Sequence, residues 1–281
     1  MSNYHQKQIT ILFTYLLLSL PVVVLAAPES ILDSYWNVFD DKNKKSINHE
    51  QWQTLLDTYL VQNDSLKQNL FSYKKVSSQD KDLLKNYLNF LKSLDPKIYS
   101  LPEQKAYWLN LYNALTVNLI LESYPVESIT DIKQRFYHFG PWDDKIVDVK
   151  GKQLSLNDIE HRILRPIWKD PRIHYGVNCA SIGCPNLLLK VFTGKNVDAL
   201  LKQAAVDFIN HDRGVLFEEE QLSLSKLYSW YQVDFGEGEE GVIKHLMKYA
   251  KPKLKIKLKN YQGSILYEYD WRLNDSLGKS L

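Results

Sequence analysis

The sequence predicts one mostly helical α+β domain, in which a buried central helix packs on a small, largely antiparallel sheet. Three observations indicate this fold class. Helical spacing of apolar residues recurs along the chain, one helical segment is apolar on nearly every side, and the strand-like segments are short and bounded by turn residues. We expect the strands of the sheet near Val147, Tyr175, Leu216 and Tyr267.

The N-terminal residues have the pattern of a secretory signal peptide. Lys7 precedes an apolar run over residues 9–25, and the small residues Ala26 and Ala27 follow it. We expect cleavage after Ala26 (signal peptide 1–26) and a periplasmic or secreted protein without a membrane span after cleavage. An uncleaved anchor is less favoured, because Pro21 interrupts a run that is slightly short for a span of about 20 residues.

The composition limits the classes of partner. After cleavage the chain has 34 basic and 33 acidic residues, and this near-neutral balance argues against a nucleic-acid partner. The seven tryptophans and eighteen tyrosines suit core packing, or a surface that binds a peptide or a carbohydrate. The mature chain is long enough for a large core, and we divide it into an N-terminal helical extension at residues 27–64 and a globular domain at residues 65–281.

Two amphipathic helices are expected in the extension, at residues 31–39 and 52–60. The loop between them has the composition of an EF-hand but not its spacing, because lysines and Gln51 stand where a glycine and oxygen ligands are required. We therefore predict a solvated loop that is closed by a Ser46 or Asn48 cap.

A helix at residues 80–94, ended by Pro96, precedes the predicted central helix at residues 103–124. Apolar residues cover nearly all sides of the second helix, so we expect it to be buried. Its Asn110 and Asn113 share a face, and a buried amide requires hydrogen-bond partners. Structural hydrogen bonds to a neighbouring loop are favoured over contact with a substrate.

Residues 129–142 show no regular pattern, and His138 in this segment has no predicted role. Residues 145–154 then alternate on either side of a turn, which predicts a small hairpin. Ser155 begins a helix and has Asp158 three residues later, which is a weaker version of the capping box.

The C-terminal third is predicted to contain helices at residues 197–209, 222–233 and 241–249 and strands at residues 213–217, 253–259 and 265–271. The lysines that alternate along residues 253–259 are typical of an edge strand that avoids pairing with other chains.

Residues 170–188 contain both cysteines of the chain and most of its candidate site residues. Ile173, Tyr175 and Val177 alternate as a short strand would, and Gly183 and Pro185 indicate a loop after it. The chemically capable side chains of this segment are Arg172, His174, Asn178, Cys179, Ser181 and Cys184.

Several long motifs together resemble one family. They are, in chain order, YWLNLYNALTVNLIL, SLNDIEHRILR, PRIHYGVNCASIGCPNL, LYSWYQVDFG and YDWRLN. In this order they are similar to the family called domain of unknown function 547, and the similarity covers roughly residues 65–274. The chain departs from the family pattern at Tyr175, where phenylalanine is usual, and at Arg272, where serine is usual. The resemblance implies an exported bacterial member and implies no substrate.

The candidate chemistry is that of a cysteine nucleophile, which requires a thiolate and usually a nearby base. Cys179 is the candidate nucleophile, with His161 or His174 as the base and Asp270 or an asparagine as its orienting partner. His161 is favoured, because His174 and Cys179 would project to opposite faces of one strand. The candidate substrate-binding residues, including donors to an oxyanion, are Asn110, Asn113, Arg172, Asn178 and Ser181. For Arg172 an ion pair with a neighbouring carboxylate is the favoured use.

The competing interpretation is a structural disulfide between Cys179 and Cys184, which secretion permits and the short loop allows. A zinc site from the same cysteines with His161 and His174 lacks a recognised ligand spacing, and we predict no metal and no cofactor. Ser181 is a weak candidate nucleophile, because no G-x-S-x-G motif surrounds it.

Two functions follow from these alternatives. The first is an exported, thiol-dependent hydrolase or acyltransferase that acts on an amide, thioester or peptide-like bond. The second is a non-catalytic envelope module that binds a peptide, glycan or protein partner through aromatic side chains, with the cysteine pair as a structural disulfide.

Overall fold

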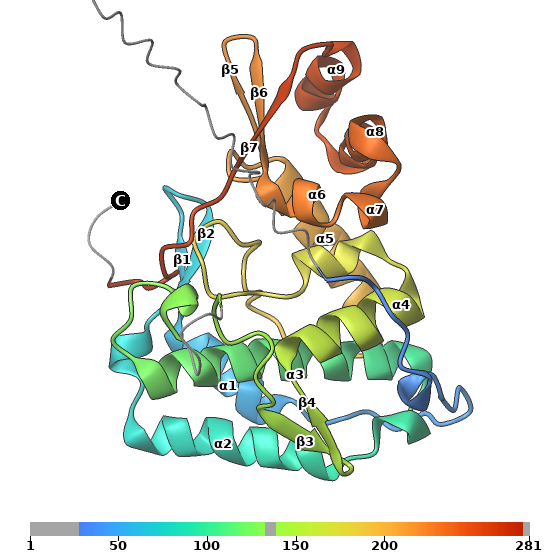
Figure 1. Ribbon diagram of the computed structural model, residues 1–281. Coiled ribbons are helices and arrows are strands. Elements are labelled where there is room, and N and C mark those ends of the chain that lie inside the picture. The colour runs from blue at the N-terminus through green and yellow to red at the C-terminus, as the bar shows by residue number, and fades with distance from the viewer. Residues whose placement is uncertain (1–27, 133–138, 278–281) are drawn as a thin grey trace, which may run out of the picture.

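The computed structural model describes residues 28–132 and 139–277 (Figure 1). The predicted signal peptide and His138 lie outside these residues. Within them the chain is mostly helical with short strands, which confirms the predicted α+β class. None of the helices in the described ranges is both long enough and apolar enough to cross a membrane.

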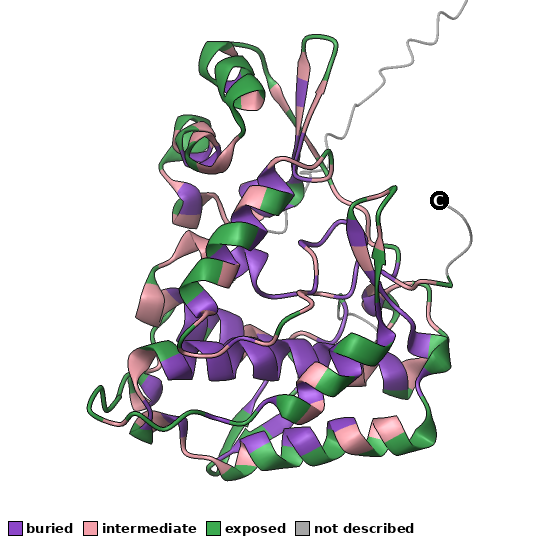
Figure 2. Cartoon of the chain, turned by 180° about the vertical axis from the view of Figure 1, so that it is seen from behind, coloured by how far each residue is buried: buried purple, intermediate pink, exposed green. Residues whose placement is uncertain are grey.

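Helix α3 (Leu101–Ser123) is the buried central helix that the sequence predicts. Every residue from Glu103 to Val117 is buried, and Trp108 and Leu109 are fully enclosed. The helix packs against α2 (Ser78–Ser93), α5 (Val197–Ile209) and the helical segment η5 (Asp158–Leu164). Figure 2 shows it as a continuous buried bar across the domain, so α3 is the platform on which the other elements are placed.

The extension contains one of the two predicted helices, α1 (Glu50–Tyr59), which leads into the hairpin of β1 (Leu60–Asn63) and β2 (Gln68–Phe71). Asn48, one of the expected caps, accepts a hydrogen bond from the Glu50 N–H (2.8 Å). The helix predicted at residues 31–39 is wrong, since only Ser34–Trp36 forms a 3-10 turn. The chain before this turn is extended because its backbone hydrogen bonds go to another helix.

The helix that accepts the hydrogen bonds of the N-terminal segment begins with η5, a π-helix, and continues into α4 (Arg165–Trp168). The predicted capping box is present: Ser155 Oγ accepts from the Asp158 N–H (3.1 Å), and Asp158 Oδ2 accepts from the Ser155 N–H (2.7 Å). Pro166 is the second residue of α4 and has no N–H to donate.

Pro166 lacks the N–H that would donate to a carbonyl one turn back, at His161 or Arg162, and the helix changes from π to α at the same point. The backbone N–H groups of Ile31 and Asp33 donate to the carbonyls of His161 and Arg162, both at 3.0 Å. These bonds hold residues 28–33 as an extended strap along the helix. The apolar residues of the strap therefore do not line a buried helix face, and Ile31 is 56% exposed.

The strand predicted over residues 173–177 is also wrong. Residues Pro171–Tyr175 form the 3-10 helix η6, with Asp170 Oδ1 accepting from the Arg172 N–H (3.0 Å). Pro171 favours this start, because its fixed φ suits a helical turn and it cannot donate to a strand ladder. Residues 176–188, which we call the cysteine loop, follow without regular structure.

The strands of the described residues form three small sheets rather than one. They are the β1–β2 hairpin, the predicted hairpin of β3 (Val147–Val149) and β4 (Lys152–Leu154), and a sheet of β5 (Val215–Glu218), β6 (Gln221–Ser225) and β7 (Ile265–Glu268). In the last sheet β5 and β6 are antiparallel, whereas β6 and β7 are parallel. Tyr175, expected in the sheet, is instead buried in the core of the C-terminal half.

Two further C-terminal predictions are corrected. The helix predicted at residues 222–233 divides into the end of β6, α6 (Lys226–Trp230) and α7 (Gln232–Phe235), and α8 (Gly238–Tyr249) follows. The lysine-rich run is helix α9 (Pro252–Asn260) and not an edge strand. Pro252 starts the helix, and Leu258 is buried while Ile256 is 63% exposed, so only one face of the helix packs on the core.

The buried residues form two hydrophobic clusters. One surrounds α3 and includes the extension, and the other lies between α5, the three-stranded sheet and helices α6 to α9. Figure 1 shows the second cluster stacked above the first, with η5 and the cysteine loop between them. The candidate site lies at this junction.

Candidate functional site

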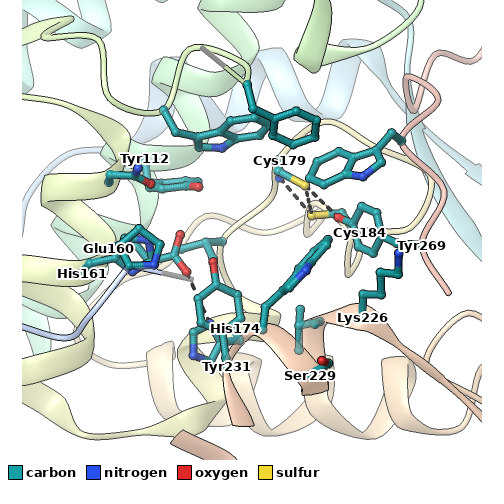
Figure 3. Close-up of a pocket in the computed structure, with 18 of the residues that line it drawn as sticks. Tyr112, Glu160, His161, His174, Cys179, Cys184, Lys226, Ser229, Tyr231 and Tyr269 are labelled. Carbon is teal, nitrogen blue, oxygen red and sulfur yellow. Dashed lines mark hydrogen bonds and ion pairs between the residues drawn. The ribbon is translucent and has the colours of Figure 1, made fainter. Parts of the chain in front are cut away.

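A cavity of about 660 Å³ opens between the two clusters (Figure 3). It is lined by both cysteines, by polar residues of η5 and η6, and by aromatic residues from the segments that enclose it. One side, which we call the aromatic wall, consists of Phe139, Trp142, Trp230, Tyr269 and Trp271. Figure 3 shows Cys179 and Cys184 on one side of the cavity and Glu160 and His161 on the other.

Cys179 Sγ is held by three side chains. It lies 2.7 Å from Cys184 Sγ, 3.1 Å from Ser181 Oγ and 3.0 Å from Tyr269 Oη. Both cysteines are free thiols, so the predicted structural disulfide is not present, since a disulfide bond is about 2.05 Å long. Each of the three neighbours carries a proton that it can donate to a thiolate at Cys179.

The two thiols differ in acidity. Burial would raise the pKa of Cys179, but the hydrogen bonds from Cys184, Ser181 and Tyr269 outweigh it and lower this pKa below its ordinary value. Burial and the neighbouring Cys179 raise the pKa of Cys184. Two sulfurs in contact cannot both ionise readily, so Cys179 is the thiol that ionises first and Cys184 keeps its proton.

The asparagines of α3 position the cysteine loop. Asn113 Oδ1 accepts from the Asn178 N–H (2.8 Å) and its Nδ2 donates to the Gly176 carbonyl (2.9 Å). Asn110 makes the same kind of pair with the backbone of Phe192, at 3.1 and 2.8 Å. Both asparagines are buried and neither lines the cavity, and their bonds are the structural hydrogen bonds that the sequence favoured.

Replacing Asn113 with alanine is expected to destabilise the protein by about 2–4 kcal/mol, because two buried backbone groups lose their partners. Urea unfolding followed by fluorescence measures this loss. Asn118→Ala on the same helix, at a half-buried position, is the control. Equal unfolding midpoints for the two variants would contradict the assigned role of Asn113.

The other end of the cysteine loop is tied to the C-terminal segment and to Arg213. The Ile182 N–H donates to the Arg272 carbonyl (2.8 Å), and the Asn274 N–H donates to the Ala180 carbonyl (3.0 Å). Arg213 Nη1 donates to the carbonyls of Ile182 and Cys184, at 2.8 and 2.5 Å. The loop is therefore fixed on both sides of the cysteine pair.

His174 lies between two carboxylates. Its Nε2 is 2.7 Å from Asp234 Oδ2, and its Nδ1 is 3.4 Å from Glu160 Oε1, a distance of an ion pair rather than of a well-formed hydrogen bond. Burial would lower the pKa of His174, but Asp234 and Glu160 outweigh it and raise this pKa above 6.5. His174 is thus a buried cation and not a free base.

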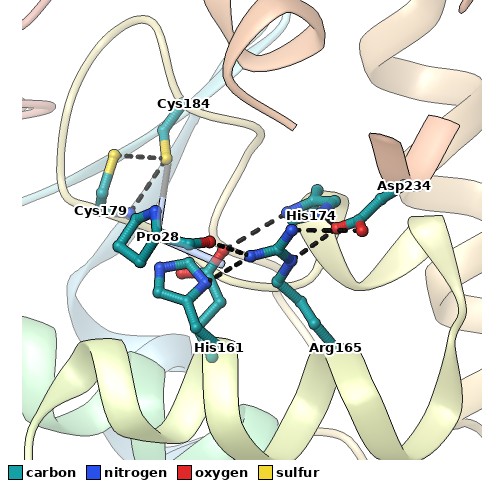
Figure 4. Close-up of polar contacts among 8 residues, drawn as sticks. Pro28, His161, Arg165, His174, Cys179, Cys184 and Asp234 are labelled. Carbon is teal, nitrogen blue, oxygen red and sulfur yellow. Dashed lines mark hydrogen bonds and ion pairs between the residues drawn. The ribbon is translucent and has the colours of Figure 1, made fainter. Parts of the chain in front are cut away.

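His161 has a different protonation state. Its Nδ1 is 3.0 Å from Arg165 Nη1, and a guanidinium only donates, so this nitrogen accepts (Figure 4). Burial lowers the pKa of His161, Glu160 opposes this effect, and the charge of Arg165 adds to it. Neutral His161 therefore carries its proton on Nε2, which makes it a donor at the cavity wall and not an acceptor for a thiol proton.

Neither histidine hydrogen-bonds Cys179 among the described residues. Figure 4 shows Cys179 and Cys184 apart from the chain of contacts that joins His161, Arg165, Asp234 and His174. The predicted thiol–histidine pair is not formed, although the cavity brings all three side chains together. The hydroxyls of Tyr269 and Ser181 take the place of a base by stabilising a thiolate directly.

Glu160, His161, Arg165, His174 and Asp234, which we call the buried charge network, predict a pH dependence of stability. Burial would raise the pKa values of Glu160 and Asp234, but His174 and Arg165 beside them outweigh this effect and lower both, that of Asp234 to about 2. Such carboxylates stabilise the fold above their unfolded pKa and lose this effect as the pH falls toward 2. His174 has a raised pKa, so its contribution is full below about pH 6.5 and is lost as the pH rises through its folded pKa.

The contribution of Glu160, Asp234 and His174 to the free energy of unfolding is therefore expected to be largest between about pH 4.5 and 6.5. The buried histidines with a lowered pKa, which include His161, His49 and His245, act in the opposite direction and favour the folded state above about pH 6.5. Urea unfolding at a series of pH values measures this curve. The part that His174 contributes is the difference in unfolding free energy between the wild type and His174→Gln at each pH. If this difference does not shrink as the pH rises above about 6.5, the charge assigned to His174 is wrong.

The remaining predicted site residues lie outside the cavity. Asp270 pairs with Arg272 at the surface and contacts neither histidine. Arg172 pairs with Asp170 (2.9 Å) and Asp198 (2.7 Å), the use that the sequence favoured. Asn178 supports the loop from within, since its Nδ2 donates to the Pro185 carbonyl (2.8 Å).

Sequence reasoning missed Tyr269 and Asp234 as site residues. Tyr269 contacts both Cys179 and Ser181, and Asp234 binds Arg165 and His174. Both lie in motifs that resemble the family, YDWRLN and LYSWYQVDFG, and this position in the motifs is the signal that could have identified them as site residues. Within residues 28–132 and 139–277, no three His, Cys, Asp or Glu side chains converge as metal ligands would.

Comparison with known proteins supports one part of the resemblance. Residues 96–209 match the family described as Protein of unknown function, DUF547. This stretch contains α3, η5 and the cysteine loop, so the elements that build the thiol side of the cavity lie within the part of the chain that is similar to this family. No curated protein and no solved structure matches the chain.

Proposed function

We propose that this chain is an exported enzyme that transfers or hydrolyses an acyl group through a thioester on Cys179. The observation that carries the proposal is a thiol with a lowered pKa, held by three hydrogen-bond donors at the wall of a cavity of about 660 Å³. Export to the periplasm or the medium is supported by the signal-peptide pattern before residue 27.

The chemistry follows from the donors around the sulfur. The Cys179 thiolate attacks the carbonyl carbon of an amide, thioester or peptide-like bond, and the carbonyl electrons move to the oxygen. The hydroxyls of Tyr269 and Ser181 and the Nε2–H of His161 are the available donors for that oxyanion. The bond to the leaving group then breaks, the leaving group takes a proton, and the acyl group remains on sulfur until water or an acceptor amine attacks it.

The aromatic wall supports a substrate with an apolar or flat group next to the reacting carbonyl. Trp271 packs within 5.6 Å of Trp142 and 5.5 Å of Trp230, as measured between ring centroids. These rings are large apolar surfaces that shield a thioester from water. The same wall also favours the second candidate, a module that binds a peptide or glycan without chemistry.

The experiment that separates the two functions uses activated acyl donors. The reduced protein is mixed with an aryl thioester, and the products are followed by absorbance and by mass spectrometry of the protein. The proposal expects turnover and an acyl adduct on Cys179. Binding of the donor without an adduct and without turnover would favour the binding module.

Removing the hydroxyl of Tyr269 tests the thiolate directly. Tyr269→Phe is expected to slow alkylation of Cys179 by iodoacetamide near neutral pH by about threefold to tenfold, because the thiolate loses one donor and its pKa rises. Tyr267→Phe is the matched control, since Tyr267 also lines the cavity but bonds Glu239. If both variants react at the wild-type rate, Tyr269 does not stabilise the thiolate.

A further inference from the structure

Cys184 lies directly behind Cys179, and the two thiols differ in exposure. Cys184 is 5% exposed, whereas Cys179 is only partly buried and faces the cavity. A molecule in the cavity therefore meets Cys179 first. Cys184 is placed to react once a group has become attached to Cys179. Acyl transfer through Cys179 does not require such a second thiol.

The contacts between the two residues are suited to exchange of a bond between sulfurs. Their Sγ atoms are 2.7 Å apart, and the Cys179 N–H points at Cys184 Sγ at 3.0 Å. This N–H is a donor for negative charge on Cys184 when that sulfur is the attacking or the leaving group. Tyr269 and Ser181 are the corresponding donors for Cys179.

The backbone of the cysteine loop does not depend on a bond between the sulfurs. Arg213 holds the Cys184 carbonyl, Asn178 holds the Pro185 carbonyl, and the Gly183 N–H donates to the Asp270 carbonyl (2.8 Å). Ala180 between the cysteines has a φ of 58°, a conformation that non-glycine residues rarely adopt and that the surrounding bonds maintain. The loop can thus keep its shape while the sulfurs form and break a bond.

We propose that Cys179 and Cys184 form a dithiol pair that carries out thiol–disulfide exchange with a disulfide compound bound in the cavity. The Cys179 thiolate attacks one sulfur of the substrate, the substrate S–S bond breaks, and one half leaves as a thiolate that takes a proton from water. Cys184 then loses its proton to water and attacks Cys179 Sγ, and the second half leaves as a thiolate that takes a proton from water. The protein gives up two electrons and two protons, and the substrate disulfide becomes two thiols.

Oxidised glutathione in excess over the reduced full-length protein tests this activity. Samples are quenched with acid and measured by intact mass and peptide mapping. The wild type is expected to lose two hydrogens and to hold a bond between Cys179 and Cys184. Cys184→Ser is expected to stop at a single glutathionyl group on Cys179. Cys179→Ser is expected to react with oxidised glutathione at least about tenfold more slowly than the wild type, because its remaining thiol is buried and protonated.

A wild-type protein that keeps both thiols, or that accumulates glutathione on Cys179 without closing the bond, would overturn the proposal. Circular dichroism of the two serine variants excludes unfolding as the cause of a difference. The result of this experiment can be distinguished from the result of the acyl-transfer experiment. Thioester turnover by the reduced wild type without bond closure leaves only acyl transfer, and bond closure without turnover leaves only exchange.

Discussion

Replacing Cys179 with alanine is expected to remove the acyl adduct and to lower thioester turnover by on the order of a thousand-fold. The reason is that neither the serine nor the second cysteine beside this sulfur has comparable surroundings. Ser181 is 2% exposed and hydrogen-bonds Tyr269, and the pKa of Cys184 is raised by burial and by Cys179 itself. Steady-state kinetics with an aryl thioester, together with intact mass, measures both effects.

Ser229→Ala is the matched control for the Cys179 variant. Ser229 lines the same cavity, and the variant removes one hydroxyl without touching the cysteine pair. It is expected to keep turnover within about twofold, since a substitution of this kind away from the chemistry has small effects. Turnover in Cys179→Ala that equals turnover in Ser229→Ala would show that the acyl group is not carried by this sulfur.

The parts of the fold that could be predicted are those in which local pattern and final environment agree. Helix α3 is apolar on all sides because it is buried on all sides, and the Ser155 capping box acts within four residues. The failures have one physical origin. Residues 31–39, 173–177 and 253–259 have apolar spacings that fit a second structure, and tertiary contacts or a proline decided which structure formed.

The candidate site could likewise be predicted only in part from the sequence. The sequence indicated Cys179 and the neighbourhood of His161, because the residue types that carry thiol chemistry are few. It could not indicate that Arg165 would occupy the Nδ1 of His161, or that Tyr269, 90 residues away in the chain, would contact the thiol. Which nitrogen of a histidine holds the proton depends on such partners, and so the predicted base becomes a donor.

Arg165 decides which nitrogen of His161 carries the proton. Among the substitutions considered, replacement of Arg165 is expected to have the largest effect on the stability of the protein. The Arg165 side chain is 3% exposed and binds Asp234 through Nε (2.6 Å) and Nη2 (3.2 Å). Nη1 also donates to the Pro28 carbonyl (2.7 Å) and to His161 Nδ1 (3.0 Å). Four contacts of one buried cation thus join the N-terminal strap, η5 and α7.

Arg165→Met keeps much of the side-chain length and removes the charge. We expect a loss of about 3–5 kcal/mol in the free energy of unfolding, because Asp234, His161 and the Pro28 carbonyl each lose a buried partner. The corresponding fall in the melting temperature is on the order of 10 °C. Arg162→Met on the same helix is the control, since Arg162 is exposed and its substitution should cost no more than about 0.5 kcal/mol. Urea midpoints measure both variants, and equal midpoints would mean that the charge network does not hold the strap and the two clusters together.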